Sequence, residues 1–566
     1  MRPLSILQRI AFTSMCWMWQ TPDQYCGRLV FYQLKIFTMK QTMHRSFISL
    51  AVLCSASLLF SCHKVKEPEG TVLPGALRSN VQTASLAEVK VMNYNIHAGI
   101  GIDGVYDLQR IADVISDADA DVVSLNEVHK HYEAATNYED QVAWLANELG
   151  MYAAFQKTTW KSAIPASGNK ERQFGHAILS KYPIEVLNTR IYDAYGSHYH
   201  GLLETRIVIN GHPMLFYVTH LATDPALLTA QRQQLRVWMD ETYGTKILMG
   251  DLNAIPTNAN ILAIKETMVD AFESQPNAYT FKSNNPTVRI DYILGTSNIT
   301  FSNSQVISTQ VSDHFPIVSH ASVGASKLKL MQYNIKHGQG TDGVVDLQRI
   351  ADVIRNSKAH VVVLNEVDRN YDPRSNYEDQ LVWLADELGM YYEFQKTTWK
   401  APVPASGNKE RQFGHGILSK YPIGNAATQG RWIYTDYTTH YMGLLKVRVS
   451  VNADPLYVYI TNLGSTAAER LSQAQEAMSF INPPNHTWKV FAGTFSDVPG
   501  SAPVAAVLTS FTDVFAGQTA YTFPANAPNV RVDYIFVKSP VAAGNTAVIS
   551  SQASTHLPIV CDIEMQ

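Results

Sequence analysis

The sequence is short of cysteine. Its 566 residues contain five cysteines, and four of them lie within the first 62 positions. Cys561 is the only thiol in the rest of the chain, so a disulfide framework is excluded there. Because Cys561 follows the apolar stretch 557–560, it is predicted to be a small buried side chain and not a reactive thiol.

The chain also lacks an excess of charge of either sign. Its 45 basic and 49 acidic residues give a formal net charge of −4. Proteins that neutralise many phosphates at once carry a basic bias, so nucleic acid remains an open partner but not the favoured one. No HExxH motif and no paired cysteine spacing occurs, which makes zinc a weak option. The 46% hydrophobic content can bury a large core, and the length suggests about two to four domains.

The N-terminal region lacks an apolar run long enough to span a membrane comfortably. Lys40, His44 and Arg45 precede about fifteen mostly apolar residues. This run ends in Leu58-Leu-Phe-Ser-Cys62, which resembles a bacterial lipobox, a motif cut before the cysteine that carries the lipid. An uncleaved anchor or a plain secretory peptide is the alternative.

We therefore expect residues 1–62 to be a leader with a lipoprotein-type signal peptide, starting at Met39 or Met43. Residues 63–87 are predicted to be a linker. A lipid on Cys62 would place the protein in the bacterial cell envelope, at the outer membrane or cell surface. Secretion without the lipid is the alternative.

One long internal repeat is present. The run Asp107–Ile115 recurs as Asp346–Ile354, and Pro165–His176 recurs without change as Pro404–His415. The period of about 240 residues is far too long for a solenoid, so two copies of a whole domain are predicted. We place the domains at residues 88–323 and 327–564, joined by the small residues 324–326.

Short β-rich runs alternate with amphipathic helical patterns in each copy. In the first copy, strands are predicted near residues 90–95, 122–125, 202–209, 214–219, 246–249 and 290–294, and helices near 108–115 and 141–149. Strands punctuated by a few helices favour a layered domain with sheets at its centre.

Polar residues with chemical potential follow several of these apolar runs. Buried carboxylates are costly unless they are paired or bind a cation, and hard oxygen ligands suit Mg²⁺, Mn²⁺ or Ca²⁺. Each residue alone has an ordinary explanation as a turn former or helix cap, so only the whole set carries weight. The set comprises Asn95, Asn126, Glu127, His220, Asp251, Asn253, Asp291, Asp313 and His314.

Seven short motifs occur in the order found in the endonuclease/exonuclease/phosphatase family, and residues 88–323 resemble that family over nearly their whole length. The motifs are Met92–Ile96, Leu125–Val128, Gly175–Ser180, Val218–Leu221, Gly250–Asn253, Arg289–Ile293 and Ser312–Ile317. The resemblance implies an α+β fold class with two tandem four-layer α/β/β/α sandwiches of the DNase I-like type.

The resemblance also implies roles. Glu127 would be the principal metal ligand for Mg²⁺ or Mn²⁺, assisted by Asn95. Asp251 and Asn253 would position or activate water, with the base left open between Asp251 and His314. Asp313 is expected to orient His314, with Asp291 supporting that pair or the metal, and His220 is expected at the scissile phosphate. His176, where relatives commonly carry Asn, and Arg172 are the substrate-site candidates, with a structural role as the alternative.

The second copy keeps part of this set. Asn334, Glu366, His415, Asp533 and His556 match first-copy residues, but Asn462, Thr494, Ser496 and Thr555 replace His220, Asp251, Asn253 and Asp313. The second domain is therefore predicted to be degenerate and inactive.

The expected function is metal-dependent hydrolysis of a phosphoester by the first domain. The substrate would be a phosphodiester or phosphomonoester, with phospholipid headgroups or phosphorylated glycans favoured over DNA. The alternatives are a non-catalytic surface lipoprotein that uses both domains for binding, or a secreted nuclease.

Overall fold

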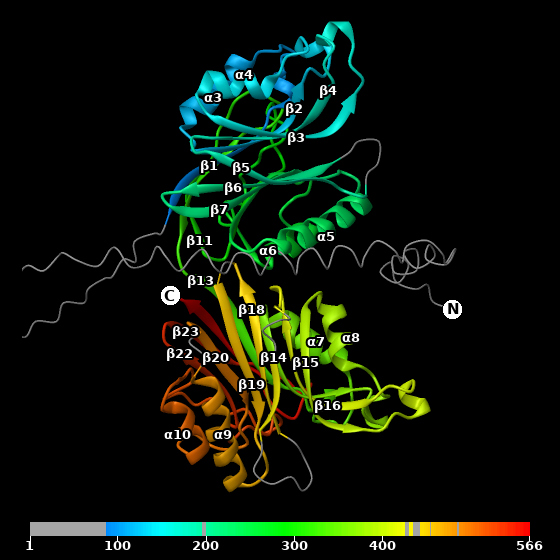
Figure 1. The fold of residues 1–566 in the computed structure, drawn as a ribbon, viewed down its shortest axis with the longest axis vertical. Helices are drawn as coiled ribbons and strands as arrows, with labels where there is room; N and C mark the ends of the chain where they lie inside the picture. Colours follow the sequence, from blue (N-terminus) through cyan, green and yellow to red (C-terminus); the bar gives the residue numbers. More distant parts are fainter. Residues whose placement is uncertain (1–86, 195–199, 425–428, 434–441, 453, 484–485) are drawn as a thin grey trace, which may run out of the picture. The chain divides into compact units, whose positions relative to one another are not determined.

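The computed structural model describes residues 87–566 apart from 195–199, 425–428, 434–441, 453 and 484–485. The predicted leader, Cys62 and the linker up to residue 86 lie outside the described residues. What is described forms two tandem α+β domains, each built on two six-stranded sheets (Figure 1). Within this part of the chain, every helix is too short or too polar to cross a bilayer.

The first sheet of the first domain has the strand order β11-β12-β1-β2-β4-β3. β1 and β2 run parallel, and the other neighbours are antiparallel. The strands are β1 (Glu88–Asn95), β2 (Val122–Lys130), β3 (Tyr152–Lys161), β4 (Arg172–Ser180), β11 (Ile299–Val306) and β12 (Ile317–Val323).

The second sheet has the order β5-β6-β7-β8-β10-β9, and again one pair, β7 and β8, is parallel. Its strands are β5 (Ile184–Ile191), β6 (Gly201–Ile209), β7 (His212–His220), β8 (Thr245–Asp251), β9 (Met268–Asp270) and β10 (Asp291–Thr296). The helices are α3 (Leu108–Ala118), α4 (Gln141–Leu149), α5 (Pro225–Glu241) and α6 (Ala259–Lys265).

Three layers of apolar contacts hold this domain together, and β1 shows how one strand serves two of them. Val89 and Val91 pack between the sheets, while Met92 and Tyr94 face α3 and α4. Successive side chains of a strand point to opposite faces, so this alternation follows from the sequence. A third cluster lies between the second sheet and α5 and α6. The result is the predicted α/β/β/α sandwich (Figure 1).

The predicted helix 108–115 is confirmed and extends to Ala118. Its start is fixed by Asp107, whose carboxylate accepts hydrogen bonds from the backbone N–H groups of Gln109 and Arg110. Asp119 ends the helix in the left-handed conformation. The apolar side chains of α3 lie on one buried face, as their spacing predicts.

The second domain repeats this topology with the equivalent strand orders β23-β24-β13-β14-β16-β15 and β17-β18-β19-β20-β22-β21. Ser326, predicted to be linker, already belongs to β13. The strands are β13 (Ser326–Asn334), β14 (Val361–Arg369), β15 (Tyr391–Lys400), β16 (Arg411–Ser419), β17 (Gln429–Ile433), β18 (Met442–Val451), β19 (Asp454–Asn462), β20 (Trp488–Thr494), β21 (Thr512–Asp513), β22 (Asp533–Lys538), β23 (Val541–Val548) and β24 (Ile559–Met565).

The helices of the second domain are α7 (Leu347–Ser357), α8 (Gln380–Leu388), α9 (Ala467–Ile481) and α10 (Ala502–Leu508). Three apolar clusters again separate four layers. Cys561 is fully buried in the layer between the sheets, as predicted. Burial raises the pKa of its thiol, which fits a packing role.

Candidate active site

The strand pairing brings the predicted residues of the first domain together. Asn95, the last residue of β1, pairs with Asn126 beside the register shift in β2, and His220 pairs with Asp251 at the ends of β7 and β8. Asp291, at the start of the antiparallel β10, lies opposite Asp251. The ends of strands from both sheets thus supply one site.

Glu127 stands at a β-bulge. The pairing of β2 with β4 shifts register between Leu125 and Val128, and Glu127 has a φ of 58°. A non-glycine residue in this left-handed region is strained, and such strain is common where a side chain is aimed at a functional site. The bulge turns the Glu127 carboxylate toward Asn95.

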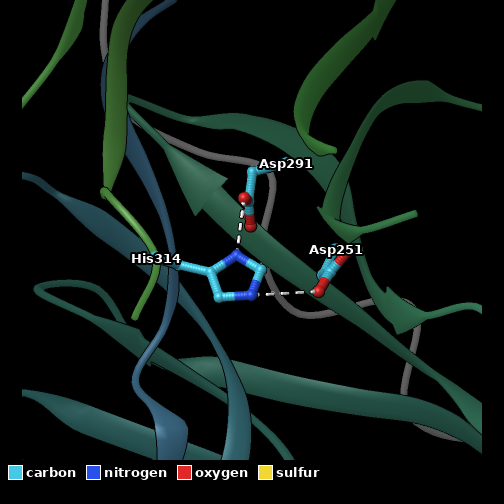
Figure 2. A group of neighbouring side chains, drawn as sticks. All are labelled: Asp251, Asp291 and His314. Atoms are coloured by element: carbon cyan, nitrogen blue, oxygen red, sulfur yellow. Dashed lines mark hydrogen bonds and ion pairs between the residues drawn. The ribbon is translucent and has the colours of Figure 1, made fainter. Parts of the chain in front are cut away.

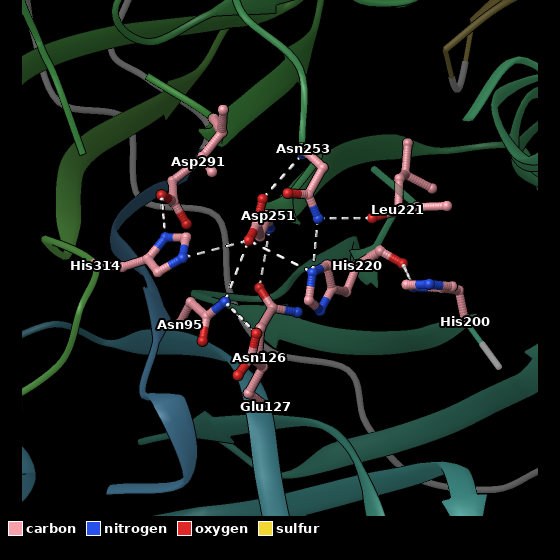
Figure 3. Close-up of polar contacts among 12 residues, drawn as sticks. Asn95, Asn126, Glu127, His200, His220, Leu221, Asp251, Asn253, Asp291 and His314 are labelled. Carbon is pink, nitrogen blue, oxygen red and sulfur yellow. Dashed lines mark hydrogen bonds and ion pairs between the residues drawn. The ribbon is translucent and has the colours of Figure 1, made fainter. Parts of the chain in front are cut away.

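Asn95 links two carboxylates. Its Nδ2 donates to Glu127 Oε1 at 3.1 Å and to Asp251 Oδ2 at 3.2 Å (Figure 3). Its Oδ1 accepts from the His97 backbone N–H at 3.1 Å, which leaves one lone pair on this oxygen. Asn95 is fully buried, so these bonds fix its amide.

His314 lies between two aspartates (Figure 2). Its Nδ1 is 2.9 Å from Asp291 Oδ2, and its Nε2 is 3.6 Å from Asp251 Oδ2. All three side chains are buried. The hydrogen bond that His314 Nδ1–H donates to Asp291 fixes the tautomer and orientation of the imidazole.

The prediction that Asp313 orients His314 is wrong. The Asp313 side chain is one-third exposed, and its Oδ1 lies 3.7 Å from His97 Nδ1. Asp291, the first residue of β10, takes the orienting role, because its carboxylate lies within hydrogen-bond distance of the histidine. The family resemblance suggested Asp313, but no hydrogen bond joins its carboxylate to His314, whose Nδ1 is engaged with Asp291.

His220 and Asn253 form the other flank of Asp251 (Figure 3). The Asn253 Nδ2 lies 2.9 Å from His220 Nε2 and also donates to the Leu221 carbonyl at 2.8 Å. The His220 Nε2 is 3.5 Å from Asp251 Oδ2. Asn253 has a φ of 49°, and its backbone N–H donates to Asp251 Oδ1 at 2.9 Å. Asp251 is therefore contacted by both histidines.

The two substrate-site candidates lie further out. His176 is buried, with its ring centre 6.2 Å from that of His220 and its Nδ1 3.4 Å from Asn126 Nδ2. Arg172 donates from Nε to the Ser162 carbonyl at 2.8 Å, and no bond from it to the residues around Asp251 occurs in the described structure.

Several supporting residues were given no role by the sequence. Asn126 accepts from the Asp251 backbone N–H at 3.0 Å, and Asn93 donates to Asp291 Oδ1 at 3.3 Å. Both are fully buried amides within β1 and β2, and an amide in an apolar strand was the available signal. His200 contacts the His220 carbonyl at 2.9 Å from outside any motif.

Burial and neighbouring charges shift the pKa values of the titrating groups in this site. Burial, together with Asp291, raises the pKa of Asp251 to about 6 against the opposing effect of His220. Burial opposes the charged form of His314, but Asp291 and Asp251 outweigh it and raise its pKa to about 10. The pKa of Glu127 is lowered, because His220 and the Asn95 hydrogen bond outweigh burial. At neutral pH the site therefore holds carboxylates beside a histidine cation.

Two places in this cluster have the chemistry to hold a cation. Asp251, Asp291 and His314 each offer a ligand atom within 4.8 Å of the others. His314 already uses both ring nitrogens toward the two aspartates, so a cation there would break those contacts. Glu127 is the better fit: its Oε1 accepts from Asn95, and no group of the described residues bonds to Oε2. Carboxylate and amide oxygens suit a hard divalent cation.

The second domain retains more of the site than its sequence indicates. His556 Nδ1 lies 2.8 Å from Asp533 Oδ2, so this histidine keeps its orienting carboxylate although Thr555 replaces Asp313. Replacement of Asp313 by Thr555 would leave His556 without an orienting carboxylate if Asp313 had that role, but the aspartate of the β22 strand supplies it instead. Thr494 instead donates its hydroxyl to Asp533 Oδ1 at 2.7 Å, at the position of Asp251.

Comparison with known proteins agrees with this architecture. The family model described as "Endonuclease/Exonuclease/phosphatase family" matches residues 92–314 and 331–556. The chain is 28% identical over 218 residues to the uncharacterized protein YbhP of Escherichia coli, covering 36% of this chain and 83% of that protein.

Solved structures with similarity include an endonuclease/exonuclease/phosphatase from Beutenbergia cavernae, at 25% identity and a TM-score of 0.38, covering 45% of this chain and 76% of that one. A mannosyl-6-phosphatase of Bacteroides thetaiotaomicron matches at 17% identity and a TM-score of 0.34, covering 41% of this chain and 99% of that one.

Members of this family are typically phosphoesterases or nucleases, and the first domain carries a buried Asp–His–Asp group at the end of its sheets. The family match extends over most of the chain and appears once in each tandem domain. The chain belongs to the endonuclease/exonuclease/phosphatase family.

Proposed function

We propose that the first domain hydrolyses a phosphoester bond with the help of Mg²⁺ or Mn²⁺ held at Glu127 and Asn95. The observation that carries this proposal is Asp251, a buried carboxylate with a histidine on each side. Burying these charged groups costs folding free energy. Buried groups with perturbed pKa values cluster at functional sites.

Within this proposal Asp251 is the proton acceptor. Its pKa, raised to about 6, leaves it ionised yet basic at neutral pH, as a general base requires. His314, with a pKa raised to about 10, stays protonated and is suited to stabilise a phosphoryl oxygen or donate a proton. Of the two bases that the sequence left open, we therefore propose Asp251.

The remaining residues position these groups. Asp291 fixes the His314 ring, Asn253 holds His220 and binds Asp251 through its backbone, and Asn126 fixes the Asp251 backbone. A divalent cation, when bound, neutralises charge on the phosphoryl oxygens. Glu127 and Asn95 are the groups that would hold it, and Asn95 joins them to Asp251.

The substrate we propose is a phosphomonoester or phosphodiester of a phospholipid headgroup or a phosphorylated glycan. The formal net charge of −4 lacks the basic excess of nonspecific nucleic-acid binders. The lipobox-like run ending at Cys62 supports a lipid anchor in the bacterial cell envelope, where such substrates occur. Membrane release of a Cys62→Ala variant would test that anchor, and unchanged partition would contradict it.

Hydrolysis is tested with the full chain on a panel of phospholipids, phosphorylated sugars and oligonucleotides. We expect EDTA to abolish turnover and Mg²⁺ or Mn²⁺ to restore it. Turnover that persists in chelator would contradict the metal part of the proposal. Preference for oligonucleotides would replace the substrate class but leave the reaction type intact.

A further inference from the structure

The second domain carries an ammonium group beside its glutamate, at a position where the first domain has a histidine. Lys336 Nζ lies 3.0 Å from Glu366 Oε2, and Asn334 Nδ2 donates to Glu366 Oε1 at 2.9 Å. Glu366 occupies the position of Glu127 and keeps the same bulge, with a φ of 58°. Both oxygens of this carboxylate are therefore engaged inside the domain.

The position equivalent to Lys336 is His97 in the first domain, which forms no ion pair with Glu127 in the described structure. Its Nδ1 lies 3.2 Å from the Ile100 carbonyl and 3.7 Å from Asp313. Glu127 Oε2, the counterpart of the oxygen bonded by Lys336, has no partner among the described residues. One carboxylate oxygen is thus available in the first domain and occupied in the second.

The balance of acidic and basic side chains also differs between the two sites, and it too disfavours a cation in the second site. The first site gathers three carboxylates, those of Glu127, Asp251 and Asp291. Two histidines, His220 and His314, lie beside them. In the second, Thr494 removes one carboxylate and its hydroxyl bonds to Asp533.

Lys336 and His556 then face Glu366 and Asp533, two basic groups for two acidic ones. A site with a carboxylate excess attracts a divalent cation, and a balanced one does not.

We propose that the Lys336 ammonium takes the place of the divalent cation in the second domain, so that the chain binds one metal ion, in its first domain only. The negative charge of Glu366 is then neutralised by the protein's own lysine, and the arrangement of this second site does not depend on a metal ion. The inference rests on the proposed function for the first domain and adds a built-in counter-ion to the second.

The test is the number of Mn²⁺ ions bound by the full chain, measured from free Mn²⁺ by electron paramagnetic resonance. We expect one ion for the wild type and none for Glu127→Gln. Adding Lys336→Met and Thr494→Asp to Glu127→Gln should restore one weaker site. The matched control is Lys396→Met, which removes another lysine–glutamate pair of the same domain. It should leave the number of bound Mn²⁺ ions unchanged.

A reciprocal exchange makes the test independent of how the second domain tolerates substitution. His97→Lys should lower the Mn²⁺ affinity of the first site by about tenfold or more. Lys336→Arg, which keeps the charge, should leave the second domain without metal.

Two ions in the wild type, one of them surviving Glu127→Gln, would overturn the inference and leave the proposed function standing. Failure of Lys336→Met with Thr494→Asp to create a site in a chain that still folds would overturn it too. No ion in the wild type would instead sink the metal part of the proposed function, and the inference with it.

Discussion

The two domains share their strand order, the bulge at Glu127 and Glu366, and a histidine held by an aspartate. They differ where β7 and β8, or β19 and β20, end. There the first domain has His220, Asp251 and Asn253, and the second has Asn462, Thr494 and Ser496. Duplication has thus separated two sets of residues: those that shape the pocket persist, while those contacting the proposed proton acceptor have changed.

The largest effect is expected from giving the first site the residue that the second site carries at the position of the proposed proton acceptor. We expect Asp251→Thr to lower kcat/KM by about 10³-fold or more, because the proposed proton acceptor is lost. Asp251→Asn should do nearly the same without changing side-chain size. Steady-state hydrolysis with circular dichroism as the folding check measures this. Near wild-type turnover of either variant would remove Asp251 from the mechanism.

The shared histidine–aspartate pairs allow a matched test. Asp291→Asn should reduce kcat by about 10²-fold, since His314 loses the carboxylate that fixes its ring and its charge. Asp533→Asn makes the same change in the second domain and should leave turnover unaltered. Equal losses from both substitutions would show that the second domain contributes to hydrolysis.

The pH dependence sharpens the assignment of the base. Asp251, with its pKa raised to about 6, is protonated below that pH and cannot accept a proton. The value of kcat/KM should therefore rise about tenfold per pH unit up to about 6 and then level off. It should fall again only near pH 10, where His314 loses its proton. A profile that falls as pH rises through 7 would assign the histidine a different role.

The smallest effect is expected at Asp313. Its side chain is one-third exposed and lies near His97 but is not bonded to His314. Asp313→Asn should therefore cost less than about tenfold in kcat/KM, well below Asp291→Asn. A loss as large as that of Asp291→Asn would restore Asp313 as the orienting residue.

Most of the fold was predictable because the repeat and the hydrophobic periodicity are local signals. The strands near 90–95 and 202–209 and the helix near 141–149 are confirmed with small changes at their ends. The four layers came from the family resemblance, and the structure confirms them. Spacing alone could not have shown which sheet faces which.

The site was predictable as a set of residues but not as a set of contacts. Asp291 and His314 are 23 positions apart and come from different sheets, since Asp291 begins β10 and His314 lies just before β12. The family resemblance had implied Asp313 as the partner instead. Lys336 was missed for a related reason: a lysine two residues after Asn334 has no meaning until the bulge turns Glu366 toward it.

Gly250 and Gly493 follow a different rule from the residues beside them. Each has a φ above 150°, and a Cβ on either would lie 1.9 Å from a carbonyl oxygen, that of Thr219 or Thr461. The glycine therefore survives in Gly493-Thr-Phe-Ser496, where the aspartate and asparagine do not. In a search for active relatives, a match at this glycine therefore indicates only that two strands approach closely there, and it does not indicate activity. The residue after it, Asp251 in the first domain and Thr494 in the second, is the one that we expect to separate an active copy from an inactive one.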